Sequence, residues 1–231
     1  MTTTTVAIGT TAAIISIFCW AIFLRGVTTM VRTIALGQKV EKVRFAHLGS
    51  RLVTMIKEFI AHTRMVKFRT VGIMHWLVMI GFLGGFLLWF EAYGQSINPE
   101  FHWPWFGDTF GWHLWDELLG IGTVVGITAL IVIRQINHPR VPARLSRFAG
   151  SRFGAAYFVE IVVLIEGLGM ILVKASKIAT YHHSNAGSDF FTMQVAKLLP
   201  ESPTLVSVFA AIKLMSGMIW LAVVGFNIDW G

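Results

Sequence analysis

Cysteine and charged residues are both scarce in this chain. Its 231 residues include one cysteine, Cys19, so the chain itself excludes a disulfide framework, a cysteine-ligated iron–sulfur cluster and a cysteine zinc site. Charged residues make up 13% of the sequence and hydrophobic residues 55%, whereas a soluble domain carries about 25% charged residues. The composition therefore indicates an integral membrane protein.

The apolar residues are divided into five segments, each near the length that a bilayer-crossing helix needs. We predict an all-α membrane protein, a five-helix transmembrane bundle that forms a single domain over residues 1–231. The first segment has no basic leader and no clear cleavage site, so we expect it to be retained as a helix. The predicted spans are residues 6–24, 71–90, 114–133, 155–173 and 205–226.

Basic residues are concentrated in two connections between the predicted spans. Residues 25–69 hold ten of them and residues 134–152 hold five, together fifteen of the nineteen Lys and Arg. The positive-inside rule predicts that both connections are cytoplasmic, that the N-terminus is outside and that the C-terminus is cytoplasmic. Because the positive charge flanks apolar spans, it is a topology signal, and we expect no nucleic-acid partner.

The first basic connection is predicted to contain a helix of its own. Residues 40–65 mix apolar and basic side chains without proline. We expect an amphipathic helix lying on anionic lipid, with a docking surface for a soluble partner as the alternative. The apolar stripe would consist of Ile56, Phe59, Ile60 and Met65.

A single histidine, His75, lies inside the second predicted span. An ionisable side chain within a membrane helix indicates a functional site, and imidazole is a common axial ligand of haem iron. Gly81 and Gly85 follow as a pair of small residues that allows a helix or a macrocycle to approach closely. Haem ligation and a structural hydrogen bond across helices are both consistent with His75.

A haem held by two histidines needs a second imidazole on a facing helix. No other histidine lies in the middle of a predicted span. His113, at the start of the third span, is the best candidate on the outer side, although it also fits an interfacial aromatic belt. The belt would include Trp103, Trp105, Trp112 and Trp115.

Three more ionisable side chains are predicted to lie deep in the membrane. Glu160 and Glu166 fall in the fourth span and Lys213 in the fifth. Glu160 is close enough to the end of its span to reach the headgroups. Glu166 and Lys213 are candidates for an intramembrane ion pair or for a proton route to a quinone.

Two stretches of the chain carry a family resemblance. They are GIMHWLVMIGF at residues 72–82 and EAYGQSINPEFHWP at residues 91–104. With the five-span layout, they resemble the amino-terminal, nitrate-reductase-gamma-like membrane domain of bacterial membrane-bound iron–sulfur-binding reductases, which is also similar to the heterodisulfide reductase membrane subunit. The resemblance implies a bacterial cytoplasmic membrane protein with b-type haem. It also implies a cytoplasmic part with [4Fe-4S] clusters after residue 231.

The resemblance also implies a function, a quinone-linked oxidoreductase. The domain would pass electrons through haem b to menaquinone, from electron-transfer flavoprotein in fatty-acid β-oxidation. Two positions at which the gamma-subunit pattern has histidines hold Gly85 and Lys213 here, so we expect one haem at His75, with its second ligand beyond residue 231. The alternatives are a haem-free membrane anchor for a soluble reductase and a proton or ion transporter that uses His75, Glu166 and Lys213.

Overall fold

Helices joined by turns and loops form the whole of the described structure. The computed structural model describes residues 1–37, 47–61, 67–146 and 148–230, and no strand occurs among them. The elements are α1 (Thr3–Ala35), α2 (Leu48–Ala61), α3 (Arg69–Gly84), α4 (Phe86–Ile97), α5 (Phe110–Ile136), the short 3₁₀ turn η3 (Ala143–Leu145), α6 (Phe153–Tyr181), α7 (Thr192–Ala196) and α8 (Pro203–Trp230).

Four of these helices are long and apolar enough to cross a membrane by themselves. They are α1, α5, α6 and α8, and α3 with α4 makes a fifth span if the bent pair is counted as one. Large apolar side chains such as Ile17 and Phe18 are exposed on the outside of the bundle, where lipid would cover them. The prediction of a helical, multi-pass membrane protein is confirmed, and each predicted span lies within one of these helices or within the bent pair.

The second span is not continuous, contrary to the prediction. Its halves, α3 and α4, meet at Gly84 and Gly85 with a bend of 52°. Glycine stabilises a helix interior poorly, and here it also leaves room for neighbouring side chains. A Cβ atom at Gly84 would lie 2.5 Å from Trp115 Cζ2, and one at Gly85 would lie 2.5 Å from Met170 Cε. The Trp115 indole donates a 3.1 Å hydrogen bond to the Gly84 carbonyl, which lies at the break.

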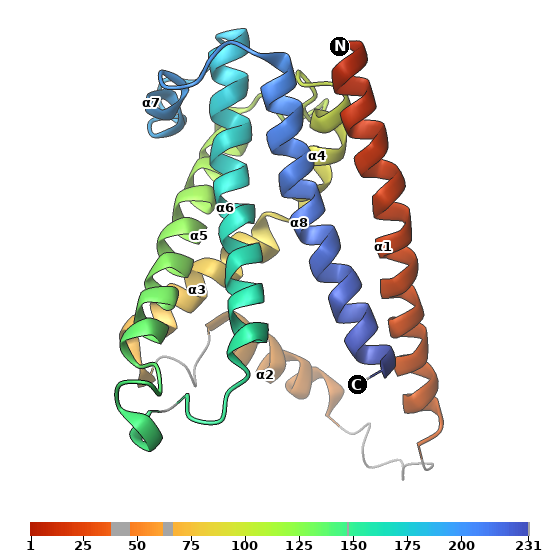
Figure 1. The fold of residues 1–231 in the computed structure, drawn as a ribbon, viewed down its shortest axis with the longest axis vertical. Helices are drawn as coiled ribbons and strands as arrows, with labels where there is room; N and C mark the ends of the chain where they lie inside the picture. Colours follow the sequence, from red (N-terminus) through yellow and green to blue (C-terminus); the bar gives the residue numbers. More distant parts are fainter. Residues whose placement is uncertain (38–46, 62–66, 147, 231) are drawn as a thin grey trace.

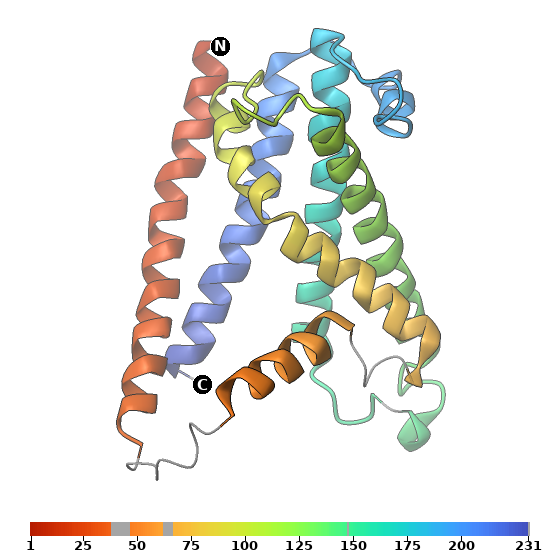
Figure 2. The same cartoon turned by 180° about the vertical axis from the view of Figure 1, so that it is seen from behind.

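The spans alternate in direction, so the two ends of the bundle differ. The N-terminus lies at one end, with the connections 98–109 and 182–202, and the C-terminus lies near the other (Figure 1). We call the first the N-terminal end. We call the second the basic end, because it holds α2 and the connection 137–152 (Figure 2). The opposite placement of the termini agrees with an odd number of crossings.

Helix α8 provides the centre of the bundle and packs against α1, α4 and α6. Its inward face is completely buried and mostly apolar. Near the basic end, α1 and α8 touch through their backbones: a Cβ atom at Gly26 would lie 2.4 Å from the Gly225 carbonyl oxygen, and one at Gly225 would lie 2.5 Å from Phe23 Cα. The apolar residues of the buried face are Val206, Ala210, Leu214 and Met218.

Candidate functional site

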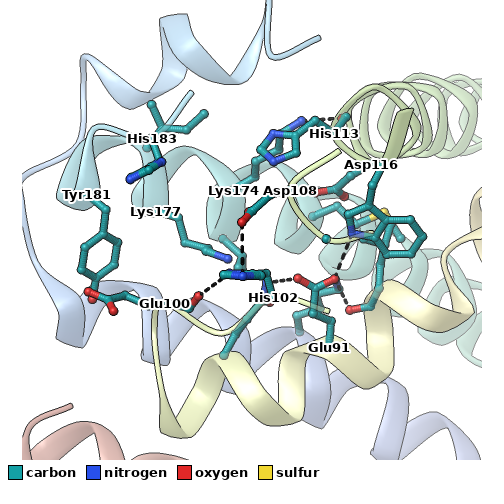
Figure 3. A pocket seen from close by; sticks show the side chains of 18 residues that line it. Glu91, Glu100, His102, Asp108, His113, Asp116, Lys174, Lys177, Tyr181 and His183 are labelled. Carbon is teal, nitrogen blue, oxygen red and sulfur yellow. Dashed lines mark hydrogen bonds and ion pairs between the residues drawn. The ribbon is translucent and has the colours of Figure 1, made fainter. Parts of the chain in front are cut away.

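A polar cavity lies near the N-terminal end, between α4, α5, α6 and α8. Its volume is about 420 Å³. Figure 3 shows that acidic, basic and histidine side chains converge on it from different helices and from the connection 98–109. The cavity also has an apolar part formed by Leu88, Met170, Val173 and Ile178. It therefore joins a charged region to an apolar one inside a membrane protein.

Glu91 is the buried acid on the α4 side of the cavity. Its side chain is 4% exposed. One carboxylate oxygen accepts a 3.0 Å hydrogen bond from Gln95 Nε2, one turn further along α4, and the other accepts a 3.2 Å hydrogen bond from Trp112 Nε1 on α5. These two donors hold the carboxylate at the cavity wall, so an ionisable group is fixed in position rather than left to turn freely.

Two of the lysines that line the cavity have N–H donors that make no hydrogen bond within the described residues. Lys213 Nζ donates to the Leu88 carbonyl at 3.0 Å, and Lys177 Nζ donates to the Phe101 carbonyl at 2.8 Å. Each ammonium group has three N–H donors, and each makes one hydrogen bond to the described residues. Asp116 also lines the cavity, and its buried Oδ1 atom has no hydrogen-bond partner among the residues described. The site thus offers free donors and a free acceptor.

Next to the cavity lies a second, fully paired network centred on Lys174. Lys174 Nζ donates to the His113 carbonyl at 2.7 Å and lies 2.9 Å from Glu117 Oε2 and 2.8 Å from Asp189 Oδ1. All three of its N–H groups therefore have acceptors. The side chains of Glu117 and Asp189 are completely buried and that of Lys174 is 8% exposed. This network is saturated, unlike Lys177 and Lys213.

The same network attaches the connection 182–202 to the bundle. Glu117 Oε1 accepts the backbone N–H groups of Phe191 at 2.6 Å and Thr192 at 2.8 Å, where α7 begins. The Thr192 hydroxyl donates to Glu117 Oε2 at 2.7 Å. A buried carboxylate at this position satisfies the amides that start the helix, which would otherwise lack partners. Glu117 and Lys174 therefore hold this connection beside the cavity.

His113 takes part in both regions. Its Nδ1 atom lies 3.0 Å from both carboxylate oxygens of Asp189, and its ring lines the cavity. Burial opposes ionisation of Asp189, but hydrogen bonds from His113, from Lys174 and from the Asn185 amide outweigh burial and hold the pKa of Asp189 well below its usual value. An ionised Asp189 fixes the His113 tautomer with Nδ1 protonated, which leaves Nε2 to interact with a cavity ligand.

His75 lies far from this site. It is half-buried on α3 and does not line the cavity. The α3 backbone next to it packs against α5 at Gly126, where a Cβ atom would lie 2.7 Å from the Met74 carbonyl oxygen. Thirteen residues separate Gly126 from His113, or about 20 Å along α5 at 1.5 Å per residue. His75 and His113 therefore cannot bind the same iron atom.

The described residues place no second imidazole beside His75. Gly81 packs against α5, where a Cβ atom would lie 1.8 Å from Thr123 Oγ1, so this glycine accommodates a helix. His62 lies outside the described residues, as does Met65 of the predicted stripe. The other described histidines lie elsewhere: His47 at the far end of α2, His138 beyond the end of α5, and His102, His182 and His183 in the connections at the N-terminal end. The described chain alone therefore does not form a two-histidine haem site.

The remaining predicted residues have separate partners. Lys213 lines the cavity, but Glu166 does not, and it accepts a 2.5 Å hydrogen bond from the Ser216 hydroxyl. The structure does not join Glu166 and Lys213 in an ion pair. Glu160 Oε1 lies 2.5 Å from Arg134 Nε, near the basic end.

Three further charged side chains that the sequence did not single out as site residues are buried in the protein: Glu91, Glu117 and Lys174. Lys174 and Lys177 follow directly after the predicted end of the fourth span at residue 173, but α6 continues to Tyr181. The sequence contained one indication that Glu117 belongs with the site residues. Glu117 follows His113 by four residues, which places both side chains on the same face of a helix.

Comparison with known proteins found no relative, since no protein-family model, no curated protein and no solved structure matches the chain.

Proposed function

We propose that this chain is the membrane domain of a quinone-linked electron-transfer reductase, and that the cavity at the N-terminal end binds the quinone headgroup. The observation that carries the proposal is the cavity itself, in which Lys177, Lys213 and Asp116 have unused hydrogen-bonding capacity inside an apolar bundle. Its volume of about 420 Å³ lies within the range of small-molecule sites.

A quinone matches both parts of the cavity. Its two carbonyl oxygens accept hydrogen bonds, which Lys213 and Lys177 are able to donate. Its ring and isoprenoid tail are apolar, as are Leu88, Met170 and Val173 on the cavity wall. A membrane-dissolved substrate also enters from the lipid, so a site between spanning helices is reached without crossing water. Menaquinone is the quinone that the family resemblance implies.

Reduction of a quinone to a quinol consumes two electrons and two protons, which convert both carbonyl oxygens to hydroxyl groups. His113 Nε2, with Nδ1 held by Asp189, and the Glu91 carboxyl group are the proton-exchanging groups at the cavity wall. Lys213 and Lys177 would orient the oxygens and stabilise the negative charge that develops on them. The electrons would come from the iron–sulfur part that the resemblance implies, with electron-transfer flavoprotein as its donor.

The b-type haem predicted at His75 remains a prediction. The described chain supplies one imidazole at that position and no second one beside it. A reduced-minus-oxidised optical spectrum of the purified protein tests it directly: haem bands that disappear in His75→Ala and persist in His182→Ala would support ligation by His75. Bands that survive in His75→Ala would exclude it.

A haem-free membrane anchor for a soluble reductase is the second candidate, and it is favoured by Gly85 and Lys213 at two positions where the gamma-subunit pattern has histidines. An anchor has no use for the unpaired donors in the cavity, and this difference separates the two proposals. We would titrate a short-chain menaquinone into the protein in lipid nanodiscs and follow quenching of tryptophan fluorescence, because Trp112 lines the cavity.

The cavity variants decide the outcome. Lys213→Met is expected to weaken quinone binding at least tenfold, while Lys213→Arg, which keeps a donor, should retain most of it. Lys197→Met is the matched control, because Lys197 is exposed and lies away from the cavity lining. Equal affinity in all four proteins would contradict the quinone site and leave the anchor as the better proposal.

A further inference from the structure

Helix α2 (Leu48–Ala61) is the one α-helix of the described structure with no buried residue. Its large apolar side chains are between 44% and 64% exposed. A 3.0 Å hydrogen bond from Trp76 Nε1 on α3 to the Ile60 carbonyl lies at the end of this helix. So much exposed apolar surface indicates that something outside the described chain covers this helix. The exposed apolar residues are Leu48, Leu52, Val53, Met55, Ile56, Phe59 and Ile60.

The two sides of α2 are completely different in character. At 100° per residue, all seven of these apolar side chains fall within one arc that covers slightly less than half of the helix circumference. The remaining arc holds Ser50, Thr54 and Glu58 near its centre and the basic Arg51 and Lys57 near its two edges. Basic residues at the edges of an apolar face are typical of helices that lie in the headgroup layer of a membrane, because their long side chains reach the phosphates.

The position of α2 in the chain keeps this helix at one face of the membrane. The chain leaves the membrane-spanning α1 at Ala35 and returns into the membrane with α3 at Arg69, so both ends of the connection are held at the same face. Figure 2 shows α2 running obliquely across the basic end of the bundle, in a direction clearly different from those of α1 and α8. A helix in this place crosses the basic end and does not follow the spanning direction.

Charge identifies the kind of lipid. The sequence between α1 and α3, including Arg69, holds eight basic residues and two acidic ones. The connection 137–152 adds four arginines at the same end. Each Lys or Arg near an anionic bilayer surface contributes about 1 kcal/mol of attraction. This excess of positive charge fits anionic phospholipid headgroups, and a neutral lipid surface gains nothing from it.

We propose that α2 is an anionic-lipid-binding helix, with its apolar face inserted among the acyl chains of the leaflet at the basic end and Arg51 and Lys57 on lipid phosphates. This proposal does not depend on the quinone site or on which side of the membrane the basic end faces. Since α2 contributes nothing to the buried core, substitutions in it leave the bundle folded and test the surface alone.

Spin-label accessibility tests the proposal in the full chain. Cys19 is first replaced by alanine, and single cysteines are placed on the apolar face at Val53, Ile56 and Ile60 and on the polar face at Ser50, Thr54 and Glu58. Each protein is labelled in nanodiscs that contain phosphatidylglycerol or only phosphatidylcholine. Oxygen, which dissolves in lipid, and a nickel chelate, which remains in water, are the two relaxation agents.

In phosphatidylglycerol, the oxygen-to-nickel accessibility ratio should be several-fold higher at the apolar-face sites than at the polar-face sites. The difference should shrink in phosphatidylcholine and in the Arg51→Gln/Lys57→Gln double variant. Nickel access at all six sites in both lipids would overturn the proposal and favour a soluble protein partner on this face. An equal pattern in both lipids would overturn the choice of anionic headgroups.

Discussion

The two ends of this molecule use charge in opposite ways. At the N-terminal end, Lys174, Glu117 and Asp189 are buried and paired with one another. At the basic end, most charged side chains are exposed, and the bundle is held by direct backbone contact between α1 and α8. The stability of the fold depends on the groups that pair with a buried charge. An exposed charge mainly determines how the protein is oriented in the membrane.

Removing the central cation of the buried network should give the largest effect. Lys174→Met leaves the carboxylates of Glu117 and Asp189 without their shared ammonium group, and breaking a buried pair costs about 3–5 kcal/mol. We expect a loss of this size in the free energy of unfolding, measured by denaturant titration in mixed micelles. Lys197→Met is the control and should be nearly neutral. A near-neutral Lys174→Met would mean that the network does not stabilise the fold.

The stability of the basic end should depend on side-chain volume at the contact between α1 and α8 rather than on charge. Gly225→Leu forces a side chain between α8 and α1, where a Cβ atom would already lie 2.5 Å from Phe23 Cα. Overpacking of this kind costs about 1–3 kcal/mol and should lower the melting temperature measured by circular dichroism. Gly154→Leu, at the same end but with no heavy atom within 4 Å of its Cβ position, is the matched control. Equal melting temperatures for the two variants would argue against backbone contact between α1 and α8.

Acid should loosen the N-terminal end selectively. The folded protein holds the pKa of Asp189 below its ordinary value of 3.8, so the unfolded chain takes up a proton first as the pH falls. The stabilisation from Asp189 is therefore complete above about pH 5 and is lost progressively below about pH 4. Melting temperatures between pH 6 and pH 3 should fall less steeply for Asp189→Asn than for the unchanged protein. Parallel pH profiles would contradict the role of ionised Asp189.

An exposed charge at the basic end should have the smallest effect on stability. Lys57→Gln removes an exposed side chain of α2, and we expect a change within about 0.5 kcal/mol in the free energy of unfolding. The same denaturant titration as for Lys174→Met provides the comparison. A loss as large as that of Lys174→Met would show that α2 contributes to the stability of the bundle, contrary to its lack of buried residues.

Most of the fold could be predicted from the sequence, because the length and apolar character of the spans are local properties. Each predicted span lies within an observed helix or within the bent pair, but the helices extend further, since α-helical hydrogen bonding does not stop where lipid ends. The break at Gly84 and Gly85 could not be predicted securely. A glycine pair also occurs in straight packed helices, and the bend depends on Trp115 and Met170 from other parts of the chain.

The candidate site was harder to predict. His113 and Lys213 were singled out because each is an ionisable residue in or beside an apolar segment, and both line the cavity. Their partners come from other helices and from the connection 182–202, and nothing in the local sequence pairs Lys174 with Asp189. Glu91 was noticed only as part of a motif, and its burial depends on Gln95 and Trp112.

The broken span restricts which substitutions the chain tolerates. The break leaves the Gly84 carbonyl at the end of α3, where the Trp115 indole donates a hydrogen bond to it inside the membrane. Lipid offers such groups no hydrogen bonds. An apolar replacement of Trp115 would therefore fit the surrounding bilayer by hydrophobicity and still be selected against, since it removes a donor that only a side chain provides at that depth.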